Sequence, residues 1–214
     1  TLHEVHREYP HHSQIISGAV KLRDRLLERI ILEISDATVV HTTEANSILR
    51  ENQGTQSKVV RMRHPVDVPV SDPKAKDAAR GELDVDTETV FVTFGWIESK
   101  KRYMDIVRCL PNLPDTTYLI AGEPRHEGDE NVLDRVFDTA AELGVRDQVR
   151  HIGYVPDEDL PTLFGAADAA IVPYEQVTQS GAVNTSLAYH CPVVTTDLPA
   201  FEELAAEYDC IRTY

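Results

Sequence analysis

Helix-like and strand-like patterns of apolar residues alternate in the first third of the chain. Apolar positions at helical spacing over residues 13–34 are followed by a strand-like run at 36–41, a helical pattern at 42–52 and a second strand-like run at 57–63. Buried-type strands that alternate with helices are typical of a parallel sheet covered by helices. The pattern therefore predicts part of one α/β domain in this stretch.

A second alternation begins near Thr89 and predicts a larger, doubly wound parallel sheet. Strands are expected at 89–95, 116–122, 148–155, 168–174, 192–196 and 210–214, and helices at 100–110, 131–144, 157–167 and from Gln179 onward. Ligands of such sheets bind beyond the carboxyl ends of the strands. We therefore expect the functional site in the loops after Gly95, Gly122, Gly153, Tyr174 and Thr196.

The net charge of −15 indicates which classes of binding partner to expect. Lys and Arg together number 21, against 36 Asp and Glu residues. Nonspecific nucleic-acid binding requires cations that displace counterions from phosphates, so we expect no nucleic-acid partner. An acidic surface also suits a halophile, whose cytoplasm screens self-repulsion, although a merely acidic protein is the equal alternative. No apolar run reaches the ~18 residues of a membrane span, and we expect a cytoplasmic protein.

Positive charge gathers after the first strand of the larger sheet. Gly95 permits a tight turn there, and Lys100, Lys101 and Arg102 follow closely. A glycine at a strand end that is followed by cations is typical of a diphosphate site. The alternative is that these cations are solvated residues at a helix start, where positive charge is mildly unfavourable. Neither GxGxxG nor GxxxxGK[ST] occurs, so nicotinamide and P-loop chemistry lose their usual support.

A second loop that favours anions follows the strand at 168–174. Glu175 precedes the turn of Gln179, Ser180, Gly181 and Ala182, whose small side chains leave the amides of a helix start uncovered. Unpaired N–H groups and partial positive charge at a helix N-terminus favour a phosphate. The alternative is that Ser180 is only the helix N-cap. Two such loops at neighbouring strand ends favour a phosphate-bearing ligand.

Four histidines, His3, His6, His11 and His12, lie near the start of the chain. Their spacing lacks the HExxH arrangement of zinc sites, so we expect no metal ion. His3 differs from the others because it ends a strand-like run. There it could orient a hydroxyl group or accept its proton near neutral pH.

The order of several segments resembles the family 4 glycosyltransferases of GT-B fold. These segments are "TLHE", "DATVVHTTEANSILREN", "KVVRMRHPVDVP", "FGWIESKKR", "YLIAG", "VRHIGYVPDEDLPTLFGAADAAIVPY" and "QSGAVNTSLAYHCPVVTTDLPAFEEL". The resemblance implies an α/β architecture, a doubly wound parallel Rossmann-like sheet with part of a second Rossmann-like domain. A proline-rich linker at 64–73 separates the two. We therefore expect residues 1–68 to end an acceptor-side domain and residues 69–214 to form most of a donor-binding domain, as a fragment of a longer protein.

The resemblance also implies an enzyme that builds cell-surface polysaccharides or related glycans. It would transfer a sugar, with retention and without a metal ion or cofactor, from a nucleoside-diphosphate sugar to a glycan, lipid or polysaccharide acceptor. The donor-binding residues would be Gly95, Trp96, Lys101, Glu175, Ser180, Gly181, Ala182 and Glu203, and His3 would be the catalytic residue on the acceptor side. Relatives with lipid-linked acceptors suggest peripheral contact with the inner face of the membrane through the basic side of the helix at 13–34. A solvated helix face is the favoured alternative.

Two positions depart from the pattern of this family. Trp96 stands where many members carry arginine, so phosphate binding would rest on fewer cations. Thr185 stands where a glutamate usually holds the ribose hydroxyls, and ribose recognition is left unassigned. Both departures favour a rival interpretation, a noncatalytic module that binds a nucleotide sugar or a partner protein. A nucleotide-sugar 2-epimerase is less favoured, because the extra acid and base residues of such a site cannot be placed.

Overall fold

The computed structural model describes residues 23, 25–27, 29–53, 59–63, 65, 71–177 and 179–214. The chain divides into two compact units, Thr1–Pro65 and Val66–Tyr214, close to the boundary expected after residue 68. Each unit has a buried core of its own, a small cluster in the first and two larger clusters in the second.

The first unit contains a short parallel pair of strands next to a helix. β1 (Thr38–Val40) and β2 (Val59–Arg61) pair with Thr38 opposite Val59, and α2 (Thr43–Gln53) connects them. These elements confirm the βαβ pattern of the sequence, with shorter strands than expected.

A further helical stretch precedes β1 in the first unit. Every described residue between positions 23 and 34 is helical, and Leu32 packs in the core with Val40, Ala45 and Leu49. Ile30 and Ile34, which belong to the apolar stripe of the sequence pattern, are exposed. Within the described part of the chain, no helix is both long enough and apolar enough to cross a membrane.

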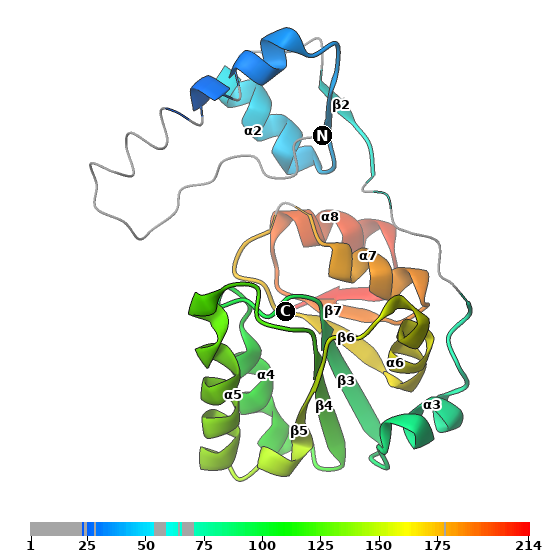
Figure 1. Ribbon diagram of the computed structural model, residues 1–214. Helices are drawn as coiled ribbons and strands as arrows, with labels where there is room; N and C mark the ends of the chain where they lie inside the picture. Colours follow the sequence, from blue (N-terminus) through cyan, green and yellow to red (C-terminus); the bar gives the residue numbers. More distant parts are fainter. Residues whose placement is uncertain are drawn as a thin grey trace. The chain divides into compact units, whose positions relative to one another are not determined.

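The second unit is a six-stranded, wholly parallel sheet in the order β5-β4-β3-β6-β7-β8 (Figure 1). Its elements are α3 (Lys76–Leu83), β3 (Thr89–Phe94), α4 (Tyr103–Cys109), β4 (Thr116–Ala121), α5 (Asn131–Glu142), β5 (Val149–Gly153), α6 (Leu160–Ala166), β6 (Ala169–Val172), α7 (Gly181–Ala188), β7 (Val193–Thr195), α8 (Pro199–Glu207) and β8 (Ile211–Thr213). All six strands confirm runs that the sequence predicted, and the order reverses next to β3, as in a doubly wound sheet.

Both faces of this sheet are buried, which explains the nearly continuous apolar strands. Leu119 and Ala121 of β4 face one core cluster, which includes residues of α6, α7 and α8. Tyr118 and Ile120 face the other cluster, together with residues of α4 and α5. Figure 1 shows α4 and α5 on one side of the sheet and α3 and α6 on the other. Alternate residues of a strand therefore serve opposite cores, as the period of two requires.

Asp168 joins α3 to the sheet at the start of β6. Its carboxylate accepts hydrogen bonds from the backbone N–H of Val90 at 2.7 Å and from Arg80 Nη2 at 2.6 Å, and it also pairs with Lys76. Burial acts to raise the pKa of Asp168, but these hydrogen bonds and cations outweigh it and hold the pKa below its ordinary value. The sequence pattern did not predict α3, whose position depends on this cluster.

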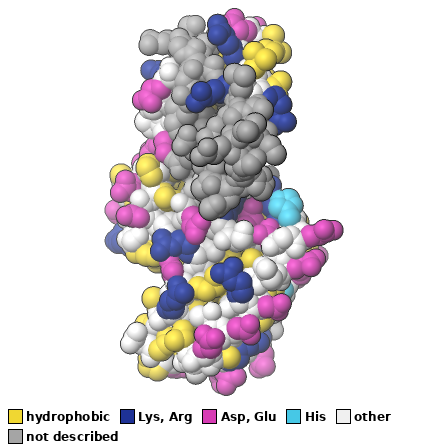
Figure 2. All heavy atoms as spheres, turned by 90° about the vertical axis from the view of Figure 1, so that its left-hand side faces the viewer, with side chains coloured by type: hydrophobic (Ala, Val, Ile, Leu, Met, Phe, Trp, Pro, Cys, Tyr) yellow, Lys and Arg dark blue, Asp and Glu magenta, His cyan; other side chains and the backbone are white. Residues whose placement is uncertain are grey.

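Opposite charges are interspersed on the face of the second unit that Figure 2 presents. Asp and Glu side chains are spread over this face, and Lys and Arg side chains lie between them. Ion pairs within the second unit include Arg102 with Asp105 and Arg125 with Glu98. On this face the Asp and Glu side chains are therefore not gathered in one patch.

Asp168→Asn is expected to destabilise the second unit by about 1–3 kcal/mol at pH 7, since the carboxylate holds charged hydrogen bonds. The contribution is present above the unfolded pKa and is lost as the pH falls toward the lowered folded pKa. The difference from the unmodified chain should therefore shrink below about pH 4. Urea unfolding followed by Trp96, the single tryptophan, measures it. Asp138→Asn, an exposed position on α5, is the control; equal losses in both variants would contradict the assignment.

Candidate functional site

Backbone hydrogen bonds join the loop after β3 to the loop after β6. Arg102 N–H donates to the carbonyl of Pro173 at 2.6 Å, and Glu175 N–H donates to the carbonyl of Lys100 at 3.0 Å. Between these bonds, Lys101 and Tyr174 form an antiparallel bridge. The two loops that the sequence selected for anion binding therefore lie side by side at the carboxyl ends of neighbouring strands.

This junction buries the side chain of Lys101. The side chain is 2% exposed, its Nζ lies 3.4 Å from the carbonyl oxygen of Phe94, and it stands 5.2 Å from the centre of the Tyr174 ring. Burial lowers the pKa of Lys101 to about 8, while the nearby Glu98 carboxylate acts in the opposite direction. At neutral pH the Lys101 side chain is charged in most molecules. Because burial leaves this charge weakly solvated, it would stabilise an anion placed against it.

The two cations next to Lys101 in the sequence, Lys100 and Arg102, already form ion pairs with carboxylates. This difference distinguishes them from Lys101. Lys100 Nζ lies 3.2 Å from Glu98 Oε1, and Arg102 Nη2 lies 2.5 Å from Asp105 Oδ2. Among the described residues, no carboxylate forms such an ion pair with Lys101. The helix expected at 100–110 begins only at Tyr103, because residues 100 and 101 belong to the loop junction. Lys101 is therefore the cation of this loop whose charge no carboxylate of the described residues pairs with.

The start of α7 supplies uncovered amides. Ser180 is the N-cap, and its Oγ accepts a hydrogen bond from the N–H of Val183 at 3.3 Å. Within the described part of the chain, no hydrogen bond is formed by the N–H groups of Gly181 and Ala182, as expected for the first turn of a helix. A side chain at Gly181 would meet no atom within 4 Å, so the space beside it is open. The capping role of Ser180 and an anion at these amides are compatible.

Ser180 also connects α7 to Tyr174, the residue beside Lys101. Burial raises the pKa of Tyr174 to about 12, and a hydrogen bond with the Ser180 side chain acts in the opposite direction. Thr196, at the end of β7, donates a hydrogen bond to the Tyr174 carbonyl at 2.7 Å. The sequence pattern identified Tyr174 and Thr196 only as the ends of predicted strands. No sequence motif indicated that these two residues help to hold the Lys101 loop in place.

Two glycines bring the ends of β3 and β4 close together. Gly95 has a φ of +96°, and a Cβ atom at Gly122 would lie 2.1 Å from the Gly95 carbonyl oxygen. Gly95 N–H donates to the carbonyl of Ala121 at 2.9 Å, and Gly122 N–H donates to that of Gly153 at 2.7 Å. Only glycine fits at 122, so this contact fixes where the Lys101 loop leaves the sheet.

The other residues predicted from the sequence are not part of the cluster around Lys101. Trp96 is 57% exposed, and Glu175 lies exposed in the loop before α7. Glu203 is half-buried on α8 and Thr185 is half-buried on α7. His3 lies outside the described residues. The structure thus brings together Gly95, Lys101, Ser180, Gly181 and Ala182.

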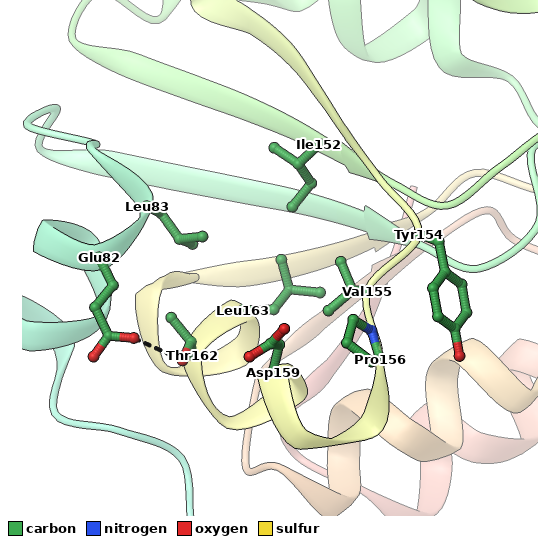
Figure 3. A pocket seen from close by; sticks show the side chains of 9 residues that line it. All are labelled: Glu82, Leu83, Ile152, Tyr154, Val155, Pro156, Asp159, Thr162 and Leu163. Atoms are coloured by element: carbon green, nitrogen blue, oxygen red, sulfur yellow. Dashed lines mark hydrogen bonds between the residues drawn. The ribbon is translucent and has the colours of Figure 1, made fainter.

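A separate cavity of about 290 Å³ lies between α3, β5 and α6 (Figure 3). Leu83, Ile152, Val155 and Leu163 form its apolar part, and Thr162 donates a hydrogen bond to Glu82 at 3.3 Å at one side. None of the residues around Lys101 lines it. Within the described residues, no group of three or more His, Cys, Asp or Glu side chains is placed to hold a metal ion.

The chain matches the family model described as "Glycosyl transferases group 1" over residues 75–212. This match includes more than half of the chain and contains the whole Lys101 junction. The chain therefore belongs to this family of glycosyltransferases. The narrower assignment to family 4 stays a prediction.

Characterised relatives are longer than this chain. The chain is 30% identical to D-inositol 3-phosphate glycosyltransferase of Mycolicibacterium smegmatis over 150 residues, 68% of this chain and 34% of that protein. It is 23% identical to mannosylfructose-phosphate synthase of Agrobacterium fabrum over 205 residues, 90% of this chain and 45% of that protein. The chain thus spans about a third to a half of the relatives it matches.

Solved structures confirm the GT-B type of fold. Sucrose-phosphate synthase from Thermosynechococcus elongatus superposes with a TM-score of 0.73 at 18% identity, covering 85% of this chain and 46% of that one. HepE of Anabaena, in complex with UDP-glucose, superposes with a TM-score of 0.73 at 16% identity, covering 90% and 52%. At such identities the likeness concerns the fold.

Lys101→Met is expected to stabilise the second unit at pH 7, because it removes a charge that burial disfavours. The lowering of the pKa from 10.5 to about 8 corresponds to roughly 3 kcal/mol. Loss of the contact with the Phe94 carbonyl offsets part of this, so we expect a gain of about 1–2 kcal/mol. The unmodified chain becomes relatively more stable as the pH rises from about 8 to 10.5, so the gain should shrink over that interval.

Urea unfolding at pH 7 and pH 10 measures this difference. Lys74→Met is the matched control, since Lys74 is exposed and pairs with Glu82 at 2.6 Å, and it should lose no more than about 1 kcal/mol. Destabilisation by Lys101→Met at both pH values would show that the lysine serves packing rather than anion binding.

Proposed function

We propose that the second unit binds a nucleoside-diphosphate sugar, with the diphosphate against Lys101 Nζ and the amides of Gly181 and Ala182. The observation that carries this proposal is a buried ammonium group that forms no ion pair with a carboxylate of the described residues. It is joined through Tyr174 and Ser180 to an uncovered helix start. Positive charge and N–H donors that converge from two loops are what a diphosphate requires.

The chemistry that follows is retaining, metal-independent glycosyl transfer of the family 4 type. Departure of a nucleoside diphosphate builds negative charge on the leaving oxygen, and Lys101 together with the α7 amides could stabilise it without a divalent cation. Gly95 holds the loop, Ser180 caps the helix, and Glu175, Glu203 and Trp96 are further donor-side residues in this proposal. His3 would orient or deprotonate the acceptor hydroxyl.

The names of similar proteins support a sugar donor and leave the acceptor open. HepE was solved with UDP-glucose, and the two curated relatives act, by their names, in making phosphorylated glycosides. We propose that the acceptor of this protein is a glycan, a lipid or a polysaccharide, with a small phosphorylated polyol as a further candidate.

A noncatalytic nucleotide-sugar-binding module is the second candidate. The exposed Trp96, where an arginine was expected, and Thr185, where a ribose-binding glutamate was expected, are the observations that favour it. A module of this kind would keep donor binding and lack turnover. The 2-epimerase interpretation gains no support from the carboxylates around Lys101, because Glu98 and Asp105 are engaged in ion pairs.

Calorimetry with UDP, GDP and ADP and with their glucose conjugates tests the proposal on the whole chain. One diphosphate series should bind, and Lys101→Ala should weaken that binding at least tenfold, since a charge-assisted contact is worth about 1.5–3 kcal/mol. Lys74→Ala, which removes an exposed lysine paired with Glu82, should bind like the unmodified chain.

Indifference to all three diphosphates would contradict donor binding, as would equal affinity in the Lys101→Ala variant. Release of the diphosphate from the bound nucleotide sugar then separates the two candidates. An enzyme should show turnover that Lys101→Ala abolishes, whereas a binding module should show none in either protein.

A further inference from the structure

Another cavity, with a polar lining, lies between the loops that follow β3 and β4, next to the loop residue Lys101 of the candidate diphosphate site. It measures about 290 Å³ and is lined by Glu98, Ser99, Lys100, His126, Gly128 and Asp129. Backbone hydrogen bonds hold the two loops together: Ile97 N–H donates to Glu123 at 2.8 Å, and Arg125 N–H donates to Ile97 at 3.1 Å. Asp129 Oδ1 accepts the N–H of Ser99 at 2.8 Å. The cavity therefore has a fixed frame.

The lining of this loop cavity suits an uncharged, hydroxyl-rich ligand. It combines two carboxylates, an ammonium group, an imidazole and a hydroxyl, and every lining residue other than Gly128 carries a polar side chain. Glu98 is paired with Lys100 at 3.2 Å and with Arg125 at 3.0 Å, so positive charge here is largely compensated. A phosphate would gain little from such a site. Donors and acceptors in close mixture instead match the hydroxyl groups of a sugar, each of which both donates and accepts.

Trp96 does not line the cavity, but it adds a flat apolar surface to the loop that supplies Glu98, Ser99 and Lys100. It stands two residues before Glu98, and its neighbours Gly95 and Ile97 are both fixed by backbone hydrogen bonds to the end of β4. Ile97 is fully buried, whereas the Trp96 side chain is 57% exposed. The backbone thus holds Trp96 in a fixed place while more than half of the residue stays exposed, so its aromatic face is accessible to a ligand.

We propose that Trp96 and the loop cavity form a binding subsite for an uncharged sugar ring. The C–H face of the ring would stack on the indole, and its hydroxyl groups would bond to Glu98, His126 and Asp129. The ring could belong to the acceptor or to the sugar of the donor, since Lys101 lies in the same loop. This inference rests on the proposed function and assigns Trp96 the recognition of sugar in place of phosphate.

Fluorescence of Trp96, the only tryptophan of the chain, gives a direct test. Quenching of this fluorescence by acrylamide is measured in the presence of three sets of ligands. The first set is UDP, GDP and ADP, and the second is their glucose conjugates. The third combines each diphosphate with the methyl α-glycoside of glucose, mannose or galactose. A sugar-bearing ligand should lower the quenching constant, and diphosphates alone should leave it unchanged. Protection by a nucleotide sugar assigns the ring to the donor, and protection by a glycoside assigns it to the acceptor.

Three results would overturn the subsite: full protection by a diphosphate alone, no protection by any probe, or an indole already shielded in the ligand-free chain. If Lys101-dependent binding of a diphosphate persists in calorimetry while no sugar protects Trp96, the subsite fails and donor binding stands.

Variants give an independent measurement of the same subsite. Calorimetric affinity for the protecting ligand should fall about three- to tenfold in Trp96→Ala and recover substantially in Trp96→Phe, which keeps an aromatic face. His126→Ala should also weaken that ligand without changing the affinity for the diphosphate. Glu127→Ala, at an exposed neighbouring position that does not line the cavity, is the matched control and should bind normally. Equal losses for sugar and diphosphate in Trp96→Ala would contradict the assignment.

Discussion

The burial of the Lys101 ammonium group, which has no carboxylate ion-pair partner among the described residues, is the constraint on which the candidate site depends. Such a charge is unfavourable in the empty protein, and its lowered pKa of about 8 expresses that cost. The lysine is held there by the backbone bonds of its own loop with the loop after β6. In the proposed function, a bound anion would supply a counter-charge, so the arrangement that costs stability in the empty protein would favour ligand binding.

The two ends of the sheet in the second unit have different roles. At the start of β6, the charges of Asp168, Arg80 and Lys76 satisfy one another and fasten α3 to the sheet. At the carboxyl ends, Lys101 and the amides of α7 lack such partners among the described residues, and the Gly95–Gly122 contact fixes the loop that carries the lysine. The ion pairs at the start of β6 stabilise the fold. In the proposed function, the Lys101 ammonium group and the α7 amides at the opposite end of the sheet bind the ligand.

Much of this architecture could be predicted from the sequence because the central strands are buried on both faces. The runs at 89–95 and 116–122 read as strands and became β3 and β4 almost without change. The helix expected from residue 100 begins instead at Tyr103, and α3 was not predicted, since both depend on contacts between distant segments. For the site, the sequence named Lys101 and the Ser180 turn. The charge pattern alone did not separate Lys101 from Lys100 and Arg102, and only the family resemblance selected Lys101. The ion pairs of Lys100 with Glu98 and of Arg102 with Asp105, which depend on the fold, agree with that selection.

Proton uptake during binding of a nucleoside diphosphate tests the central claim most directly. If the diphosphate contacts Lys101, it raises the lowered pKa of that lysine, and binding above about pH 8 must take up protons. Calorimetry in buffers of different ionisation enthalpy at pH 8.5 to 9 should therefore show an uptake approaching about one proton per bound diphosphate. The uptake should vanish in Lys101→Met. Tight binding of a diphosphate with no proton uptake at these pH values would contradict the account.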